Sequence, residues 1–149
     1  MEILLDPHSD TPLYQQLRDR MVEAIAAGRL QPGDQLESVR RLAGAYGINV
    51  ATVGKGYELL RQEGLIVTND KSGSIVARGP LSGPGTASFT DSWTPRLTTL
   101  LAEAVAQGLS RADISSSVSA VLDALAEEYL THPSSTATAA PRNETDPTP

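Results

Sequence analysis

The sequence has no cysteine, and its 149 residues include only one tryptophan, one phenylalanine and two histidines. The absence of thiols excludes disulfides, thiolate metal sites and thiol redox sensing, and it is typical of a protein from a reducing cytoplasm. No apolar run approaches the roughly 20 residues that span a bilayer, and the N-terminus does not have the pattern of a signal peptide. We therefore expect a cytoplasmic protein without a membrane-spanning segment.

Residues that could carry catalysis are also sparse. His8 and His132 lie far apart in the sequence, and no acidic residues surround either of them at metal-ligand spacing. No strand-turn-helix context presents a nucleophilic serine, and no glycine-rich phosphate loop is present. We expect no catalytic residue, no metal site and no cofactor, so an enzyme is the weakest of the functions that we weigh.

Basic residues are outnumbered, with 12 against 18 acidic residues and a net charge of −6. The deficit lies mainly in residues 80–149, which contain 3 basic and 8 acidic side chains, whereas residues 1–79 contain 9 and 10. Within residues 38–61, four basic side chains stand against one acidic one. Because DNA binding depends on local positive charge that faces phosphates, the acidic total does not exclude it.

Apolar periodicity predicts three helices in the first half of the chain, over residues 12–27, 39–46 and 50–62. Ser38 and Asn49 are placed to cap the second and third helices, since short polar side chains accept hydrogen bonds from the free N–H groups of a helix start. The backbone N–H groups at these starts also attract phosphates.

The start of the chain and the segment after the third helix have their own patterns. We expect a small strand over Ile3–Leu5, and Thr11 as the cap of the first helix with Pro12 at its first position. After the third helix the period becomes strand-like, and residues 65–68 and 74–77 predict a β-hairpin around a polar, glycine-containing loop. Helix, short helix, glycine turn, capped helix and hairpin is the order of a winged helix-turn-helix.

The second half of the chain has a different composition. Residues 80–92 are rich in proline and glycine and read as a linker, residues 93–130 predict two amphipathic helices, and residues 131–149 predict a disordered tail. Neither helix has enough core to bury its stripe alone, so we expect the pair to dimerise the protein. The residues expected at this contact are Trp93, Leu97, Leu100, Leu101, Ala104, Val118, Val121, Leu122 and Leu125.

The predicted fold is thus mainly α with a small β-hairpin: an N-terminal winged helix-turn-helix domain over residues 1–79, with its core at 11–79, followed by a two-helix C-terminal dimerisation region. A family pattern in the first half, in order and with the expected spacing, is carried by residues 12–17, 28–36, 38–43, 47–49, 52–53, 63–66 and 72–77. Through these segments the first half resembles the GntR family of bacterial regulators, and the short two-helix C-terminus resembles its YtrA-type branch.

The resemblance implies a helix-turn-helix over about residues 39–58 and a role for individual residues. Arg40 matches a family arginine that reaches a phosphate or a base edge, Asn49 to Thr52 begin the recognition helix, and Lys71 lies at the wing tip. Many members have arginine where this chain has Val50 and Gly54, so base reading by arginine is limited. The full set of expected DNA-binding residues is Ser38, Arg40, Arg41, Asn49, Val50, Ala51, Thr52, Lys55, Lys71 and Gly73.

The leading hypothesis is a homodimeric repressor that binds a palindromic operator in double-stranded DNA and controls its own operon, with transporter genes among the targets that the resemblance implies. One alternative is a regulator gated by a small molecule, of unknown identity, bound between the C-terminal helices. Another is a winged helix that binds a protein instead of DNA, which the acidic balance favours. Steep salt dependence is expected only for DNA binding.

Overall fold

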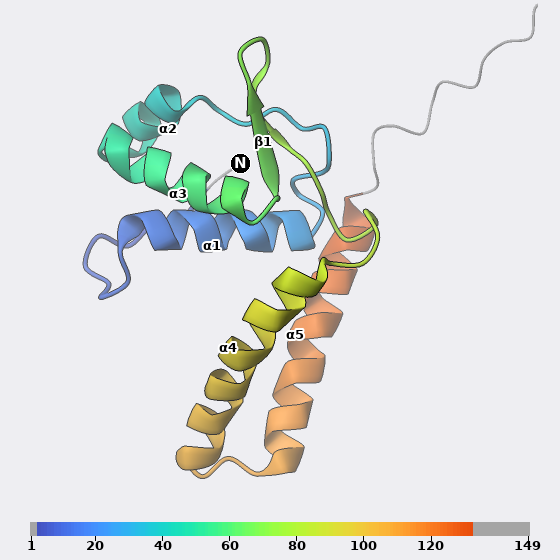
Figure 1. Cartoon of the computed structure of the whole chain (residues 1–149). Helices are drawn as coiled ribbons and strands as arrows, with labels where there is room; N and C mark the ends of the chain where they lie inside the picture. Colours follow the sequence, from blue (N-terminus) through green and yellow to red (C-terminus); the bar gives the residue numbers. More distant parts are fainter. Residues whose placement is uncertain (1–2, 133–149) are drawn as a thin grey trace, which may run out of the picture.

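A computed structural model of the chain describes residues 3–132 and shows a small N-terminal domain from which two long helices extend (Figure 1). The mainly helical fold with one antiparallel hairpin agrees with the prediction. The elements in order are α1 (Leu13–Ala26), α2 (Val39–Tyr46), α3 (Val50–Gln62), β1 (Ile66–Asn69), β2 (Gly73–Val76), α4 (Ala87–Ala106) and α5 (Arg111–Thr131).

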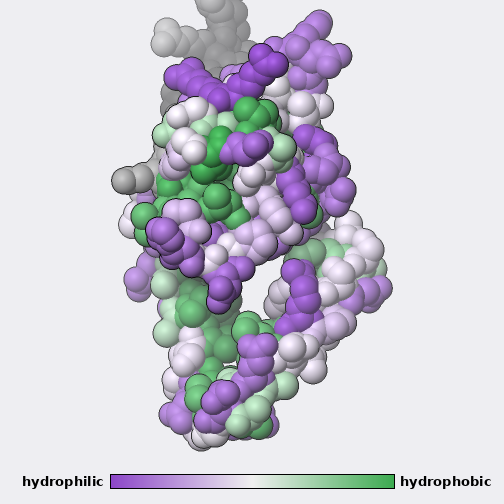
Figure 2. All heavy atoms as spheres, turned by 90° about the vertical axis from the view of Figure 1, so that its left-hand side faces the viewer, coloured by the Kyte–Doolittle hydropathy of each residue, from purple (hydrophilic) through white to green (hydrophobic). Residues whose placement is uncertain are grey.

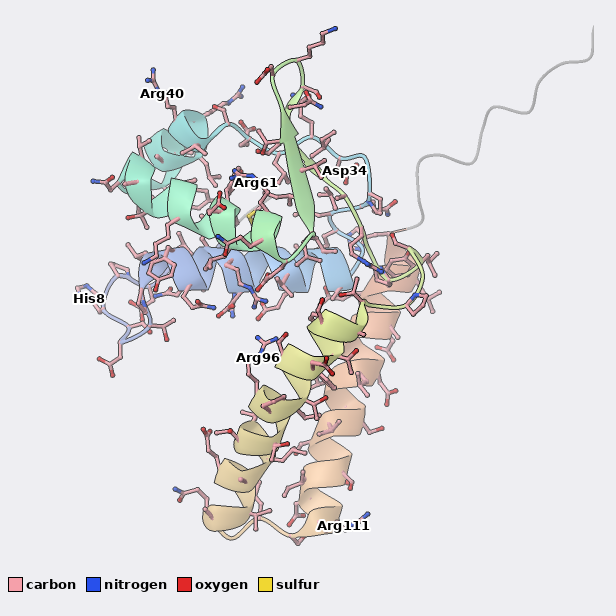
Figure 3. All side chains as sticks on the ribbon, in the orientation of Figure 1. His8, Asp34, Arg40, Arg61, Arg96 and Arg111 are labelled. Atoms are coloured by element: carbon pink, nitrogen blue, oxygen red, sulfur yellow. The ribbon has the colours of Figure 1, made fainter. Side chains whose placement is uncertain are left out.

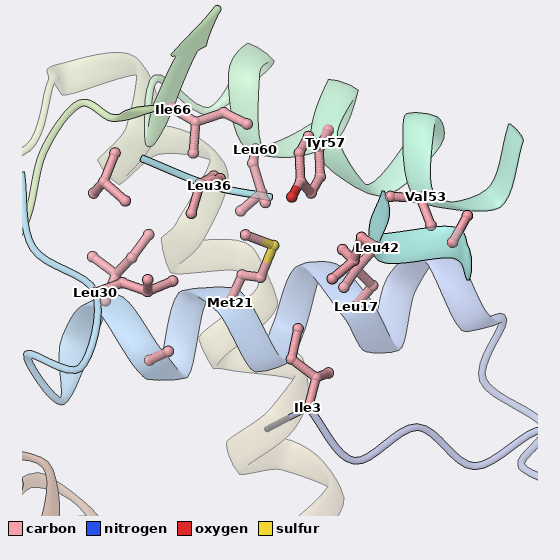
Figure 4. Close-up of a cluster of buried hydrophobic side chains, with 14 residues drawn as sticks. Ile3, Leu17, Met21, Leu30, Leu36, Leu42, Val53, Tyr57, Leu60 and Ile66 are labelled. Atoms are coloured by element: carbon pink, nitrogen blue, oxygen red, sulfur yellow. The ribbon is translucent and has the colours of Figure 1, made fainter. Parts of the chain in front are cut away.

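The hydrophobic core lies entirely in the N-terminal domain, where α1 packs against α3 and α2 covers the start of α3 (Figure 4). Its largest fully buried side chains come from the facing sides of α1 and α3, and one more comes from β1. The predicted helices over residues 12–27 and 50–62 thus each bury one apolar face in this core. These buried side chains are Leu17, Met21, Val53, Tyr57, Leu60 and Ile66.

The start of the chain differs from the prediction in two ways. Ile3 and its neighbours form no strand; instead, Ile3 is buried in the core, and its backbone N–H donates a hydrogen bond of 2.8 Å to the Tyr46 hydroxyl. The N-cap of α1 is Pro12, not Thr11. The carbonyl of Pro12 accepts the first helical hydrogen bonds, and a proline can stand at this place because a helix start does not use the missing N–H.

In the hairpin, Ile66 pairs with Val76 and Asn69 pairs with Gly73. The first strand lies one residue later in the sequence than predicted, and the second strand lies one residue earlier. It is attached to the rest of the domain by the segment before α2. The Leu36 N–H donates to the Ser74 carbonyl at 2.8 Å, and the Val76 N–H donates to the Asp34 carbonyl at 3.0 Å. The wing is therefore held at its base while its tip extends away from the helices (Figure 1).

The first C-terminal helix is longer than predicted. We expected it to begin near Thr94 after a linker over residues 80–92, but α4 begins at Ala87. Thr86 caps it by accepting a hydrogen bond of 3.2 Å from the Phe89 N–H, a signal that the glycines and prolines just before it obscured. Pro95 lies inside α4 and removes one helical hydrogen bond without ending the helix.

The second C-terminal helix, α5, begins with a capping box that Ser110 and Asp113 form, and it ends one residue beyond the predicted range of 93–130. No residue of α4 or α5 is buried, and apolar side chains lie at the surface of this lower part of the molecule (Figure 2). No helix among residues 3–132 is long and apolar enough to cross a membrane. The disordered tail was predicted over residues 131–149, but Thr131 is the last residue of α5, and residues 133–149 lie outside the described residues.

The end of α5 returns to the N-terminal domain. The Tyr129 ring packs against Gly28 so closely that a Cβ at Gly28 would lie 2.7 Å from the ring. The Gln31 side-chain amide donates to the His132 carbonyl at 2.7 Å. These contacts join α5 to the segment that follows α1, so the helix pair has a defined attachment to the domain.

Candidate nucleic-acid interface

The unit α2–turn–α3 is built by three local devices that the sequence predicted. The Ser38 hydroxyl accepts a hydrogen bond of 3.3 Å from the Arg41 N–H, and the Asn49 side chain accepts one of 2.7 Å from the Ala51 N–H. Between the helices, Gly47 adopts the left-handed conformation with φ of 62°, which costs glycine little because it has no Cβ. The starts of both helices are thereby fixed and lie at the surface.

Arg40 and Arg41 follow each other at the start of α2 but differ in their partners. Arg41 forms an ion pair with Glu37, with 2.9 Å between Nε and Oε2. Arg40 is exposed, points away from the domain (Figure 3), and forms no ion pair with any residue in the range 3–132. The charge of Arg40 is the one that this helix offers to a ligand.

The local excess of positive charge in residues 38–61 is smaller than the residue count indicates. Arg61 pairs with Glu58, and Arg41 pairs with Glu37, which lies just outside this range. Arg40 and Lys55 are the two basic side chains of this segment that make no ion pair within the described part of the chain. Each copy of the domain therefore presents few free cations, and binding to a polyanion depends on their placement.

Lys55 is held by a contact that the sequence analysis missed. Its Nζ lies 3.8 Å from the centroid of the Tyr14 ring, on α1, in a cation–π arrangement. Such a contact contributes about 0.5–1 kcal/mol at an exposed site. Because the two residues are 41 positions apart, only the crossing of α1 and α3 brings them together. The ammonium group is thus oriented beside α1 while Lys55 remains exposed.

The first turn of α3 presents a mainly apolar surface. Val50 is 49% exposed and Ala51 is exposed, whereas Thr52 is half-buried and Val53 is fully buried in the core. Exposed aliphatic groups at a helix start can contact thymine methyl groups, but they cannot donate hydrogen bonds to base edges. The geometry therefore favours Val50 and Ala51 over Thr52 among the predicted recognition residues.

The two glycines of α3 have different surroundings. A Cβ at Gly56 would lie 3.1 Å from the Leu17 side chain and 3.1 Å from the Tyr14 carbonyl, so Gly56 permits the close crossing of α1 and α3. A Cβ at Gly54 would meet nothing within 4 Å. Gly56 is thus a packing residue of the core, and Gly54 belongs to the open surface of the recognition helix.

The wing tip is ordered by Asn69, whose side-chain oxygen accepts hydrogen bonds from the Lys71 N–H at 3.1 Å and the Ser72 N–H at 2.6 Å. Gly73 follows with φ of +69°, which explains the glycine there. Lys71 is exposed at the tip beside Asp70. Lys71 therefore lies in the projecting loop, as predicted, whereas Gly73, which we expected in that loop, is the first residue of β2 and pairs with Asn69.

The predicted dimerisation residues divide into two groups on α4 and α5. Leu97, Leu101, Ala104 and Leu125 are half-buried within the single chain. The residues of the second group are more exposed, and the side chains of Leu100 and Leu122 are 62% and 61% exposed. The remaining members, all exposed at between 43% and 60%, are Trp93, Val118 and Val121.

Comparisons with known proteins agree with this geometry. The model of bacterial regulatory proteins of the gntR family matches residues 13–76. The solved structure of YtrA from Sulfolobus acidocaldarius, described as a GntR-family transcription factor, is 38% identical with a TM-score of 0.55, and the match covers 70% of this chain and 97% of that one. The chain belongs to the GntR family. Residues 13–76 are its DNA-binding helix-turn-helix domain, and the chain is a transcription regulator of the YtrA type, not an enzyme.

Two further relatives define how far the likeness extends. The HTH-type transcriptional repressor YtrA of Bacillus subtilis is 41% identical over 75 residues, which cover 50% of this chain and 58% of the relative. The chain thus matches less than two thirds of that protein. A transcriptional antiterminator from Listeria monocytogenes superposes over 87% of this chain and 90% of its own with a TM-score of 0.72, and at 24% identity this shows a shared fold alone.

Proposed function

We propose that this GntR-family chain acts in the cytoplasm as a homodimeric repressor that binds a palindromic operator in double-stranded DNA. The observation that carries the proposal is the complete absence of buried residues in α4 and α5 next to a domain that has its own core. Helices of 20 and 21 residues with exposed leucine and valine side chains need a partner surface. A second copy supplies one, because an isologous contact matches each stripe with itself.

Dimerisation also addresses the scarcity of free cations in one domain. Arg40 and Lys55 give each copy few contacts with phosphates, and a two-fold pair doubles that number. The half-sites then lie about one helical turn apart or a multiple of it, since each recognition helix enters a major groove on the same side of the duplex. Dimer formation and operator binding are therefore expected to be lost together.

Repression is favoured by the likeness to the Bacillus subtilis repressor YtrA, which matches the DNA-binding half of this chain. We infer that the operator overlaps the promoter of the chain's own operon, and that transporter genes are candidate targets, as in the YtrA-type branch that the sequence resembles. Deleting the gene is expected to raise transcripts of the adjacent genes. Lower transcripts after deletion would identify an activator instead.

The direct test is a gel shift with the promoter DNA of the chain's own operon. We expect Arg40→Ala to weaken binding by about tenfold or more, since one positioned arginine contact contributes roughly 1–3 kcal/mol. Arg41→Ala is the matched control on the neighbouring residue, and its effect is expected to be smaller because Glu37 already pairs with Arg41. Equal effects of the two substitutions would contradict the assignment of Arg40.

The dimer is tested by sedimentation with Leu122→Asp, which places a charge on the exposed stripe of α5, against Ser116→Asp on the opposite face of the same helix. Leu122→Asp is expected to yield monomers and to weaken the gel shift, while Ser116→Asp leaves both unchanged. A Leu122→Asp protein that remains dimeric would exclude this surface. DNA retardation that does not weaken as salt rises would count against binding through phosphates.

A further inference from the structure

A cavity of about 590 Å³ lies where the N-terminal domain meets the start of α4. Its walls come from α1, from the end of α3, from the loop between β2 and α4, and from the first three turns of α4. Its volume falls within the range of about 300–1,000 Å³ that is usual for small-molecule sites. The side chains that matter for its chemistry are Arg18, Glu63, Arg78, Phe89, Trp93 and Arg96.

The loop that forms one wall is fixed by its own hydrogen bonds. The Arg78 guanidinium donates to the Gly83 carbonyl at 2.8 Å and to the Pro84 carbonyl at 3.0 Å. The Gly79 N–H donates to the Ser82 hydroxyl at 2.9 Å. A Cβ at Gly85 would lie 3.2 Å from the Phe89 ring, so the loop also packs tightly on α4. The cavity therefore has a preformed wall.

The charge inside the cavity is positive although the whole chain is acidic. Arg18 is neutralised by Glu63, at 2.7 Å, and by Asp19, at 3.0 Å. Burial lowers the pKa of Arg18, but the hydrogen bonds and charges of these two carboxylates outweigh it and leave the pKa above its ordinary value. Arg78 and Arg96 form no ion pair within residues 3–132, so they are the uncompensated charges of the cavity.

The apolar part of the cavity lies on the same helix as one of these charges. Phe89, Trp93 and Arg96 are spaced four and three residues apart on α4, which puts them on one face of the helix. Arg96 points from α4 toward α1 (Figure 3). Two aromatic rings beside a planar guanidinium are suited to a flat apolar body that ends in an anionic group, because the rings stack and the guanidinium donates paired hydrogen bonds to the oxygens of a carboxylate or sulfonate.

We propose that this cavity binds a small aromatic carboxylate or a similar organic anion, with the ring between Phe89 and Trp93 and the anion at Arg96 and Arg78. The site lies between the DNA-binding domain and α4, and so differs in place from the pocket between α4 and α5 that we expected for an effector. Because its walls belong to both α1 and α4, a bound ligand would influence the orientation of the C-terminal helices relative to the N-terminal domain. Binding itself does not depend on the proposed repressor role.

The test uses anilinonaphthalene sulfonate as the probe, because it is a flat aromatic anion whose fluorescence rises in apolar surroundings. Trp93 is the single tryptophan of the chain and lies in the cavity wall, so energy transfer from tryptophan to the probe reports binding at this place. We expect saturable transfer with the full chain. Arg96→Gln is expected to weaken it about tenfold, the loss of one charge-assisted hydrogen bond.

The controls separate this site from general surface binding. Arg111→Gln removes an exposed arginine at the far end of the helix pair (Figure 3) and is expected to leave the affinity unchanged. Phenylnaphthylamine, a neutral analogue of the probe, is expected to bind more weakly and with equal affinity to the chain and to Arg96→Gln, while thermal unfolding confirms that both proteins are folded.

Three outcomes would overturn the proposal. The first is saturable probe binding without energy transfer from Trp93. The second is an equal affinity of Arg96→Gln and Arg111→Gln for the sulfonate. The third is transfer that disappears as the protein concentration rises and dimers form, which would show that a second copy of the chain fills the cavity.

Discussion

The N-terminal domain and the C-terminal helix pair are stabilised in opposite ways. Residues 3–76 enclose a cluster of fourteen buried hydrophobic side chains, contributed by three helices, the hairpin and the segments between them. Helices α4 and α5 are longer than any helix of that domain, yet bury none of their residues. The difference indicates that the domain is a folding unit of its own, whereas the stability of the pair depends on its partner surface.

The junction between the two regions is small but specific. Tyr129 packs on Gly28, and an ion pair of 3.6 Å joins Arg29 to Glu128. These contacts attach the end of α5 to the end of α1, near the cavity wall that α1 shares with α4. A dimer formed by the helix pair therefore sets the spacing of the two DNA-binding domains through a short connection.

The largest expected effect comes from the core of the domain. Leu17 is fully buried, and Leu17→Ala is expected to lower the free energy of unfolding by about 2–5 kcal/mol through lost burial and the resulting cavity. The loss is expected at every protein concentration, because the cavity lies within one chain. Urea denaturation followed by circular dichroism measures it.

A leucine-to-alanine substitution in the helix pair tests whether its stability differs in origin from that of the N-terminal domain. Leu100 is 62% exposed in the single chain, so Leu100→Ala is expected to cost little when the protein is dilute and more as the concentration rises. A concentration-independent loss as large as that of Leu17→Ala would mean that the helix pair has a core within one chain.

The sequence predicted the domain well because its signals are local. Ser38, Gly47 and Asn49 determine the starts and the turn of the helix-turn-helix through bonds to their near neighbours, and each is found as expected. The start of α4 was misplaced because Thr86 follows a run of proline and glycine that usually indicates a loop. The contact of Lys55 with Tyr14 required knowledge of the α1–α3 crossing, which no local pattern contains.

Substitutions of the two glycines of α3 are expected to change the stability by smaller amounts and in opposite directions. Gly56→Ala is expected to destabilise the chain by about 1–2 kcal/mol, because the added methyl group would be forced against the Tyr14 carbonyl and Leu17. Gly54→Ala is expected to stabilise it by up to about 1 kcal/mol, since alanine favours the helix and the site is open. Thermal unfolding of both variants decides this, and stabilisation by Gly56→Ala would contradict the close packing of the helices.

The smallest expected effect concerns Tyr57, whose hydroxyl donates a hydrogen bond of 2.7 Å to the Glu37 carbonyl. Tyr57→Phe is expected to cost about 1 kcal/mol at neutral pH. Tyr129→Phe is the matched control in the helix pair, since it keeps the ring on Gly28, and its cost is expected to be smaller.

The pH dependence of stability gives a second test of the environment of the Tyr57 hydroxyl. Burial, followed by the nearby Glu37 carboxylate, raises the pKa of Tyr57 from 10.0 to about 12. Below pH 10 the phenol is neutral in both the folded and the unfolded chain, and its contribution to stability is complete. As the pH rises from 10 toward 12, the unfolded chain loses this proton first, so the contribution is lost across that window. Tyr57→Phe is therefore expected to lose stability less steeply than the unaltered chain between pH 10 and 12, and parallel curves in urea denaturation would show that the Tyr57 hydroxyl is not shielded by the core.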